Sequence, residues 1–262
     1  MTKTARLEHL VSAVNRVGAD LAIQMRLKTD AVIVNQCDRF EYLEMDNCGS
    51  RLRIYNCNER GVGLSRNTAI LHAEAEISLI SDEDIVYTDT YVEDILKEFD
   101  THPRADMILF NVEQSDGRYT YHNDSFGRVH IWNSGRYPAY SIAVRTDRLK
   151  QSKVTFSTLF GGGAKYGSGE DSLFFKDALK AGLRIYKSQV LIGHEITRKS
   201  TWFEGYNEKY FFDKGVLYYH LYGKMAEIIG FIYLYRHKDE WCKELEFKKC
   251  LDLIKKGIKS AK

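Results

Sequence analysis

Short apolar runs alternate with amphipathic stretches along the first half of the chain. Runs rich in β-branched and aliphatic residues predict strands, and apolar residues that recur every three or four positions predict helices. The predicted strands are 10–14, 30–35, 52–55, 77–80 and 107–112, and the predicted helices are 19–28, 63–73 and 91–99. Strands and helices that alternate in this way are typical of an α/β fold with a mostly parallel central sheet.

The second half of the chain is patterned differently. Residues 119–137 are polar and aromatic, which is typical of a loop or an antiparallel ribbon, and three glycines after Phe160 indicate a loop. Further strands are predicted at 139–145, 183–186 and 190–192, a helix at 172–181, and helical segments at 215–236 and 240–259. We therefore expect a domain over residues 1–212, whose two halves meet at about residue 115, and a C-terminal helical extension over 213–262.

Composition narrows the class of protein. The 262 residues are 44% hydrophobic, and 38 basic against 36 acidic residues leave a formal net charge of +2. That balance gives no strong field for binding nucleic acid. The cysteines at 37, 48, 57, 242 and 250 form no CxxC pair and indicate reduced thiols in a cytoplasmic protein. No stretch has the length and apolarity expected of a signal peptide or a membrane span.

An acidic triplet follows a predicted strand in ISLISDEDIVY, residues 77–87. Asp82 and Asp84 stand at alternate positions, and carboxylates so placed can hold Mg²⁺ or Mn²⁺ together with substrate phosphates. An acidic turn between two elements explains the same letters. The segment NQCD, residues 35–38, follows another predicted strand, and ligands of parallel sheets lie beyond the carboxyl ends of the strands. Two polar segments at one sheet edge favour a binding site there.

Three further segments place polar groups at helix or strand ends. GVGLSRN, residues 61–67, opens a predicted helix, where Arg66 could pair with a phosphate or with a carboxylate of the site. GSGED, residues 167–171, opens another helix with two carboxylates, one of which could act as a general base. His194 follows a predicted strand, and Trp202 could stack on a sugar or pack in a core. Helix capping, a structural salt bridge or an ordinary structural histidine explains each segment taken alone.

The order of these segments resembles the inverting glycosyltransferases of family 2, which have the GT-A fold. The resemblance covers about residues 8–205, and its closest parts are ISLISDEDIVY and GSGEDSLFFKDALKAGLRIY. It implies that the half before residue 115 binds a nucleotide diphosphate sugar, with a UDP-sugar favoured. It implies that the following half, to residue 212, binds a glycan or lipid-linked acceptor in surface polysaccharide synthesis, and that Mn²⁺ or Mg²⁺ is the cofactor.

The resemblance also implies a role for each matching residue. Asp171 would be the catalytic base with Glu170 beside it, and Asp84, Asp82 and His194 would hold the metal. The nucleotide-sugar set would be Ser12, Val14, Gln36, Asp38, Arg66, Asn67, Asp82 and Glu83, and the acceptor set would be Trp202, Gly162 and Gly163. Within the acidic triplet, Glu83 points elsewhere at the alternate position and is expected to tolerate change.

Two strands depart from the family pattern. The first reads LVSAVNR, without Pro-Thr-Tyr-Asn, and the second ends in NQCD, not in Asp-Asp-Gly-Ser. The base-binding assignments therefore rest on less similarity than the metal and catalytic ones. Two other classes stay open: a non-catalytic module that binds a sugar nucleotide or glycan, and a sugar nucleotidyltransferase. The nucleotidyltransferase is expected to carry a basic glycine-rich loop near the first strand, and LVSAVNRVGAD supplies none.

The C-terminal segment has two interpretations. Residues 215–238 hold several aromatic residues and end in Arg236, His237 and Lys238. They could form a core or docking helix, or lie at a membrane interface near a lipid-linked acceptor. We expect a cytoplasmic protein, with peripheral contact to the inner face of the cell membrane and a homo-oligomer as open alternatives.

Overall fold

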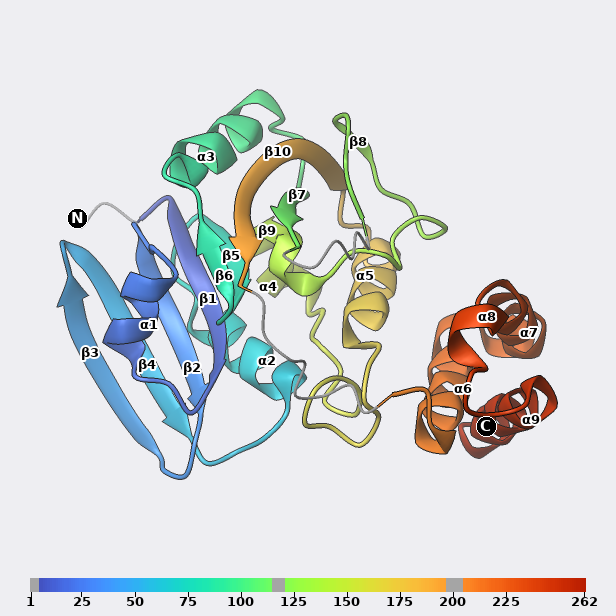
Figure 1. Cartoon of the computed structure of the whole chain (residues 1–262). Helices are drawn as coiled ribbons and strands as arrows, with labels where there is room; N and C mark the ends of the chain where they lie inside the picture. Colours follow the sequence, from blue (N-terminus) through green and yellow to red (C-terminus); the bar gives the residue numbers. More distant parts are fainter. Residues whose placement is uncertain (1–4, 115–120, 197–204) are drawn as a thin grey trace.

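A ten-stranded mixed sheet forms the centre of the protein (Figure 1). The computed structural model describes residues 5–114, 121–196 and 205–262. The strand order is β3-β4-β2-β1-β5-β9-β7-β10-β6, with β8 paired to β10. The strands are β1 (Leu7–Val14), β2 (Asp30–Gln36), β3 (Glu41–Asn47), β4 (Ser50–Cys57), β5 (Ile77–Asp82), β6 (Ile85–Tyr87), β7 (Met107–Glu113), β8 (Gly127–Arg128), β9 (Ile142–Arg145) and β10 (Ile185–Glu195). The helices are α1 (Gly18–Gln24), α2 (Val62–His72), α3 (Tyr91–Thr101), α4 (Thr146–Ser152), α5 (Glu170–Lys180), α6 (Glu208–Tyr222), α7 (Ala226–Arg236), α8 (Lys238–Trp241) and α9 (Phe247–Ser260).

The neighbouring strands β4, β2, β1 and β5 run parallel to one another, which confirms the predicted mostly parallel core. Their register places Val14 beside Gln36 and Ser12 beside Asp82. The carboxyl ends of the four strands therefore meet at one edge of the sheet, where ligands of such folds lie.

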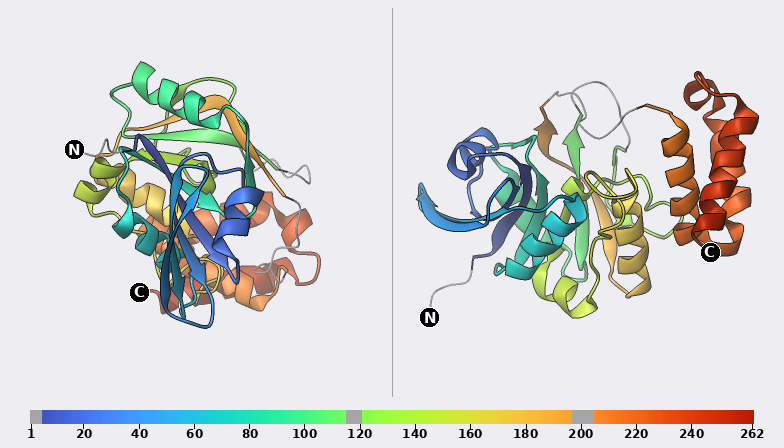
Figure 2. Two further views of the ribbon diagram at one scale, coloured as in Figure 1. Left: turned by 90° about the vertical axis from the view of Figure 1, so that its left-hand side faces the viewer. Right: turned by 90° about the horizontal axis from the view of Figure 1, so that it is seen from below.

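Helices cover both faces of this sheet (Figure 2). On one face, α1 and α3 contribute Met25, Tyr91 and Phe99 to a core with the strands. On the other face, α2, α4 and α5 contribute residues such as Leu149 and Phe174 to a second core. All five side chains are almost completely buried, so each face of the sheet is covered by packed apolar groups.

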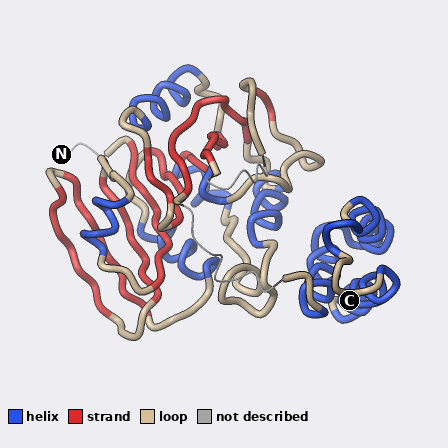
Figure 3. The backbone as a smooth tube through the Cα atoms, in the orientation of Figure 1, coloured by secondary structure: helices blue, strands red, loops and turns tan. Residues whose placement is uncertain are grey.

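β3, β9 and β10 differ from the predictions because of their places in the sheet, and β6 was not predicted at all. β3 lies at the edge and is largely exposed, so no run of apolar residues reveals it. β9 lies between β5 and β7, antiparallel to both, and residues 142–144 are all buried and do not alternate. β10 is one long curved strand where two were predicted (Figure 3), and its pairing with β7 shifts between Lys187 and Leu191.

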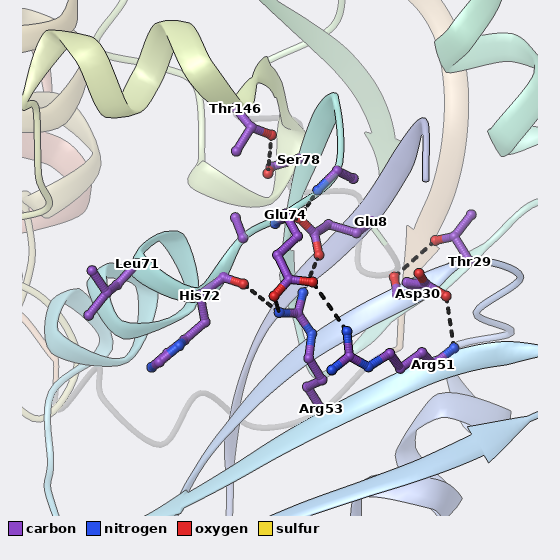
Figure 4. Close-up of polar contacts among 12 residues, drawn as sticks. Glu8, Thr29, Asp30, Arg51, Arg53, Leu71, His72, Glu74, Ser78 and Thr146 are labelled. Atoms are coloured by element: carbon purple, nitrogen blue, oxygen red, sulfur yellow. Dashed lines mark hydrogen bonds and ion pairs between the residues drawn. The ribbon is translucent and has the colours of Figure 1, made fainter. Parts of the chain in front are cut away.

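A buried ion pair fixes the C-terminal end of α2. The side chains of Glu8 on β1 and Arg53 on β4 are 1% and 5% exposed, and their charged atoms lie 2.7 Å apart (Figure 4). Arg53 also donates to the His72 carbonyl at the end of α2, and Glu8 accepts from the backbone N–H groups of Glu74 and Ala75. Burial raises the pKa of Glu8, and these donors oppose that shift. The network ties α2 to two strands of the sheet.

The C-terminal helices α6–α9 pack around a small apolar core of their own, beside the sheet domain (Figure 1). The predicted helical segment 215–236 is two helices, α6 and α7, because the chain turns at Gly223 with a φ of 54°. α6 begins at Glu208, so the expected boundary between residues 212 and 213 falls inside this helix. Within the ranges 5–114, 121–196 and 205–262, no helix combines the length and apolarity that crossing a membrane requires.

Two glycines form the crossing of α6 and α9. A Cβ atom added to Gly215 would lie 2.1 Å from the Ile254 carbonyl oxygen, and one added to Gly257 would lie 2.1 Å from that of Phe212. Real Cβ atoms do not approach a carbonyl oxygen so closely, so only glycine permits this separation of the two backbones.

Gly215→Ala is expected to push α6 and α9 apart and to lower the free energy of unfolding by about 1–3 kcal/mol, because the added methyl group overpacks the crossing. Urea or thermal unfolding measures the change. Gly135→Ala is the matched control, since the atom nearest to its new Cβ, Ser172 Oγ, lies 4.0 Å away. Equal stability of the two variants would contradict the close crossing.

Candidate active site

Arg66 of α2 is buried among three carboxylates. Its guanidinium nitrogens lie 2.9 Å from Asp171, 3.0 Å from Asp82 and 3.3 Å from Glu170, and its side chain is 4% exposed. The guanidinium also lies over the Phe156 ring, 5.1 Å from its centroid. Of the two partners that the sequence left open for Arg66, it pairs here with the carboxylates. One side chain thus joins the end of β5 to the start of α5.

The charge of this cluster is unbalanced, because three carboxylates surround one guanidinium. Burial and the charge of Glu170 raise the pKa of Asp171 to about 7, and Arg66 opposes that shift. Asp171 Oδ1 faces Arg66, and Oδ2 accepts a hydrogen bond from the Ala139 N–H at 3.1 Å. A carboxylate held in place by two partners, with a pKa near neutrality, has the properties of a general base.

A glycine loop lies against Glu170. The Gly169 N–H donates to Glu170 Oε2 at 3.1 Å, and a Cβ added to Gly161 would lie 2.7 Å from the Glu170 carboxyl carbon. Gly161 also has a φ of 105°, which favours glycine. The neighbouring Gly162 carbonyl accepts from the Val62 N–H at the start of α2. The loop therefore joins the beginnings of α2 and α5.

Helix α6 of the C-terminal unit packs against the same loop. The Gly167 N–H donates to Asp213 at 3.0 Å, and a Cβ added to Gly169 would lie 2.5 Å from Leu217. Asp213 is buried and also pairs with Lys209. The first half of α6 therefore holds the loop that precedes the acidic pair, and it belongs to the surroundings of the site.

Lys214, also on α6, is a cation of the site that sequence reasoning missed. Its ammonium lies over the Tyr210 ring, 5.3 Å from the centroid, and interacts electrostatically with Glu170. Burial lowers the pKa of Lys214, and Glu170 opposes that shift. Lys214 lies more than forty residues after the acidic pair, and the sequence gives no local signal that brings the two together.

Glu83, in the middle of the acidic triplet, is a structural anchor. Its carboxylate accepts from the Val14 N–H at 2.9 Å and from Arg16 Nε at 3.0 Å, and the residue is 6% exposed. These bonds attach the turn after β5 to the segment after β1. These contacts do not support the expectation that Glu83 tolerates change, because its removal would leave the partly buried Val14 N–H without its acceptor.

Ser12 and Gln36 lie at the shared sheet edge, as predicted. Ser12 Oγ accepts from Ser65 Oγ at 3.0 Å, which joins β1 to the first turn of α2. Gln36 Oε1 accepts from the Gly61 N–H at 2.7 Å, just before that helix. Both side chains are buried, so they shape the edge where α2 begins.

Asn67 and Asp38 occupy very different surroundings. Asn67 Nδ2 donates to the Phe156 carbonyl at 2.8 Å, and its Oδ1 accepts from the Phe156 N–H at 2.7 Å. Both polar atoms of Asn67 thus hold residue 156, and a contact with a nucleotide would have to replace these bonds. The Asp38 side chain is 90% exposed beyond β2, with Arg39 3.6 Å away.

Comparison with known proteins shows to which family the chain belongs. The family profile described as Glycosyl transferase family 2 matches residues 29–164, slightly more than half of the chain. The chain belongs to glycosyltransferase family 2. A search of curated proteins found no significant match for this glycosyltransferase.

Solved structures support the GT-A fold. Residues 1–349 of S. aureus TarS, in complex with UDP-GlcNAc, align with a TM-score of 0.66 at 16% identity, covering 98% of this chain and 82% of that one. The longer S. aureus TarS structure aligns with a TM-score of 0.64 at 16% identity, covering 98% of this chain and 49% of that one. TarS 1–349 in complex with UDP aligns with a TM-score of 0.57 at 18% identity, covering 89% and 72%.

The predicted metal ligands fit a metal only in part. Strand pairing sets His194 opposite Val86, and the Ile196 N–H donates to the Asp84 carbonyl, so the end of β10 runs beside the acidic turn. His194 is exposed there, and Asp82 pairs with Arg66. In the described part of the chain, no three His, Cys, Asp or Glu side chains gather closely enough to hold an ion by themselves. The surplus of carboxylates nevertheless suits an ion whose remaining ligands are substrate phosphates.

The predicted acceptor residues are only partly described. Trp202 lies outside the described residues. Gly162 and Gly163 lie in the loop beside Glu170, where Gly163 is exposed, but Gly161 is the glycine that touches the carboxylate. The φ of 105° explains why position 161 is a glycine. The run of three glycines in the sequence predicted the loop, but did not show which of them touches Glu170.

Glu83→Ala is expected to lower the free energy of unfolding by about 1–3 kcal/mol, because the Val14 N–H and Arg16 lose their acceptor. Chemical unfolding measures the loss. Glu83→Gln should recover part of it, since the amide oxygen can still accept, and Glu93→Ala on the exposed face of α3 is the control. The anchor would be refuted by a Glu83→Ala variant as stable as the control.

Proposed function

We propose that this glycosyltransferase moves a sugar from a nucleotide diphosphate sugar, a UDP-sugar being favoured, to a hydroxyl group of a glycan or lipid-linked acceptor, with inversion at the anomeric carbon. The observation that carries the proposal is the position of Arg66, which contacts Asp82 on one side and the pair of Glu170 and Asp171 on the other. A donor phosphate site at Asp82 and a base at Asp171 would thus lie on opposite sides of one guanidinium.

Asp171 is the base in this proposal. It removes the proton of the acceptor hydroxyl as that oxygen attacks the anomeric carbon and the nucleoside diphosphate leaves. Its hydrogen bond from the Ala139 N–H and its ion pair with Arg66 fix the direction of the carboxylate, so positioning adds to proton transfer. One base and a single displacement give inversion.

A divalent ion, Mn²⁺ or Mg²⁺, would be held by Asp84 together with the diphosphate of the sugar nucleotide. Asp82 at the end of β5 and His194 on β10 would be further ligands of the ion. When bound, such an ion stabilises the charge that develops on the leaving diphosphate. Arg66 keeps Asp82 oriented toward this place, and Glu83 holds the turn on which both aspartates lie. The uncompensated charge of the partly buried carboxylates supports a cation at the site.

The donor and acceptor are supported by different observations. UDP-GlcNAc and UDP were bound in the S. aureus TarS structures, which share the fold, and this supports a UDP-sugar. Ser12, Val14, Gln36 and Asp38 lie at the ends of β1 and β2, where the nucleoside would lie beside the diphosphate. The acceptor would approach from the side of the glycine loop, near Gly162, Gly163 and Lys214. We place the reaction in the cytoplasm, in surface polysaccharide synthesis.

Asp171→Asn is expected to lower the transfer rate by about 10²–10⁴-fold, because the acceptor hydroxyl loses its base. A panel of UDP- and GDP-sugars with Mn²⁺, read as nucleoside diphosphate release, measures the activity, and calorimetry with the same sugars should find donor binding largely unchanged. Normal turnover in the variant would overturn the role of Asp171. Pyrophosphate chemistry by the wild type would favour a nucleotidyltransferase, and binding without turnover would favour a non-catalytic module.

The dependence of kcat/KM on pH provides an independent check of Asp171. The pKa of this base is raised to about 7, so the carboxylate is protonated and inactive at lower pH. kcat/KM should therefore rise with pH and level off above a midpoint near 7, since this parameter reports groups of the free enzyme. A rate that is level from pH 5 to 8 would contradict the raised pKa.

Asp84→Ala is expected to remove the Mn²⁺-dependent part of donor binding, because the metal loses a carboxylate ligand. Calorimetry with UDP-GlcNAc, with and without Mn²⁺, gives the two affinities and their ratio. Asp147→Ala, on the exposed first turn of α4, is the control. If the Mn²⁺ dependence of Asp84→Ala equals that of the control, Asp84 holds no metal.

A further inference from the structure

Helix α7 presents an apolar stripe to the outside of the C-terminal unit. One face of α7 packs inward through Ala226, Gly230 and Leu234, which recur every four residues and are buried. The opposite face carries the stripe, which consists of Met225, just before the helix, and Ile228, Phe231, Ile232 and Tyr235. These five side chains are between 42% and 57% exposed. Positions 225, 228, 231 and 235 are three or four residues apart, and Ile232 follows Phe231 directly, so the five lie on one side of the helix.

The C-terminal unit is also the basic end of the chain. Residues 223–262 hold ten Lys and Arg against six Asp and Glu, whereas residues 1–222 hold 28 against 30. Exposed cations stand at both ends of the stripe: Lys224 directly precedes Met225, and the Lys238 ammonium lies over the Tyr235 ring, 5.1 Å from its centroid. The Phe231 ring contacts Phe247, which is followed by exposed Lys248 and Lys249 on α9.

An apolar stripe with cations at its edges matches the surface of an anionic bilayer. Aliphatic and aromatic side chains enter the boundary between headgroups and acyl chains, while lysine and arginine stay with the anionic headgroups. Tyr235 with Lys238 shows this division in one pair, because the ring is apolar and the ammonium above it is charged.

We propose that the stripe on α7 and its neighbouring lysines bind an anionic lipid surface. Within the predicted segment 215–238, the stripe thus belongs to α7 and the residue before it, whereas Tyr218 of α6 is buried. The orientation also has a consequence for the site. α6 contacts the loop before Glu170, and α7 lies on the outer side of the C-terminal unit, beyond α6 (Figure 1), so the lipid surface would be connected to that loop only through α6.

Sedimentation with vesicles tests the proposal on the full chain. Wild type should bind vesicles of phosphatidylcholine and phosphatidylglycerol at about 7:3 much more strongly than vesicles of phosphatidylcholine alone. Raising NaCl from about 0.05 M to about 0.5 M should weaken that binding, because it screens the lysines. Phe231→Ser/Ile232→Ser/Tyr235→Ser should bind at least about tenfold more weakly, because the inserting side chains are lost. Lys224→Gln/Lys238→Gln should lose mainly the preference for phosphatidylglycerol.

Trp132→Ser is the matched control, because Trp132 is 79% exposed and lies outside the C-terminal unit. It should bind vesicles like the wild type. The unfolding midpoint of the stripe variant should stay near that of the wild type, since the replaced side chains are exposed. Nucleoside diphosphate release without vesicles should also be unchanged, which separates this test from that of the proposed function.

Two outcomes would overturn the lipid surface. Wild type that stays in solution with the phosphatidylglycerol vesicles refutes it directly. Wild type that is a dimer by light scattering, and that becomes a monomer in the stripe variant without any change in sedimentation with vesicles, would assign the stripe to a second copy of the chain.

Discussion

The buried guanidinium of Arg66 is the interaction on which the site depends. A guanidinium taken out of water is stable only when its charge and its N–H groups find partners, and here three carboxylates from two distant segments supply them. The Arg66 Nε has no hydrogen-bond partner within the described residues, so the carboxylates hold the guanidinium through its two terminal nitrogens. Since breaking a buried pair leaves an unpaired charge, Arg66 must keep the two segments together in the folded protein.

Contacts at both ends and along one side of α2 hold this helix, and with it Arg66, in place. At its C-terminal end, the Glu8–Arg53 pair attaches the helix to β1 and β4. At its N-terminal end, Ser65 bonds to Ser12, and the Val62 N–H bonds to the glycine loop. On its side, a Cβ added to Gly63 would lie 2.1 Å from the Ser157 carbonyl oxygen. A helix fixed at both ends and along one side can present a charged side chain to a cluster without losing much conformational entropy, which is a condition for precise catalytic geometry.

Local patterns in the sequence were sufficient for much of the fold, whereas the roles expected of the acidic groups came from the resemblance to a family. Ile77–Ile80 and the β-branched run at β2 predict buried parallel strands, and parallel strands bring their carboxyl ends to one edge, so the segments that follow β2 and β5 could be placed together. β3 could not be found, because an exposed edge strand such as Glu41–Asn47 shows no apolar pattern. The predictions that failed inside the site depend on contacts between residues far apart in the chain. Glu83 resembles a solvated residue in its triplet, and only the fold shows that its partners are Val14 and Arg16.

The role of the C-terminal helices also depends on contacts between residues far apart in the chain, and these contacts involve the site itself. Patterns of apolar residues indicate an appended helical unit, and nothing in them shows that α6 takes part in the site. Yet Asp213 accepts from the Gly167 N–H, Leu217 fills the space beside Gly169, and Lys214 interacts with Glu170. Any displacement of α6 would therefore move side chains that contact the loop before Glu170 directly. α6 is fixed to α9 at the Gly215–Gly257 crossing, and α7 packs on both helices. A surface bound by α7 is therefore connected to the acidic pair through packed helices. The C-terminal helices are therefore part of the surroundings of the acidic pair and not only an extension of the sheet domain, because a surface attached to α7 would be linked through α6 to the loop before Glu170.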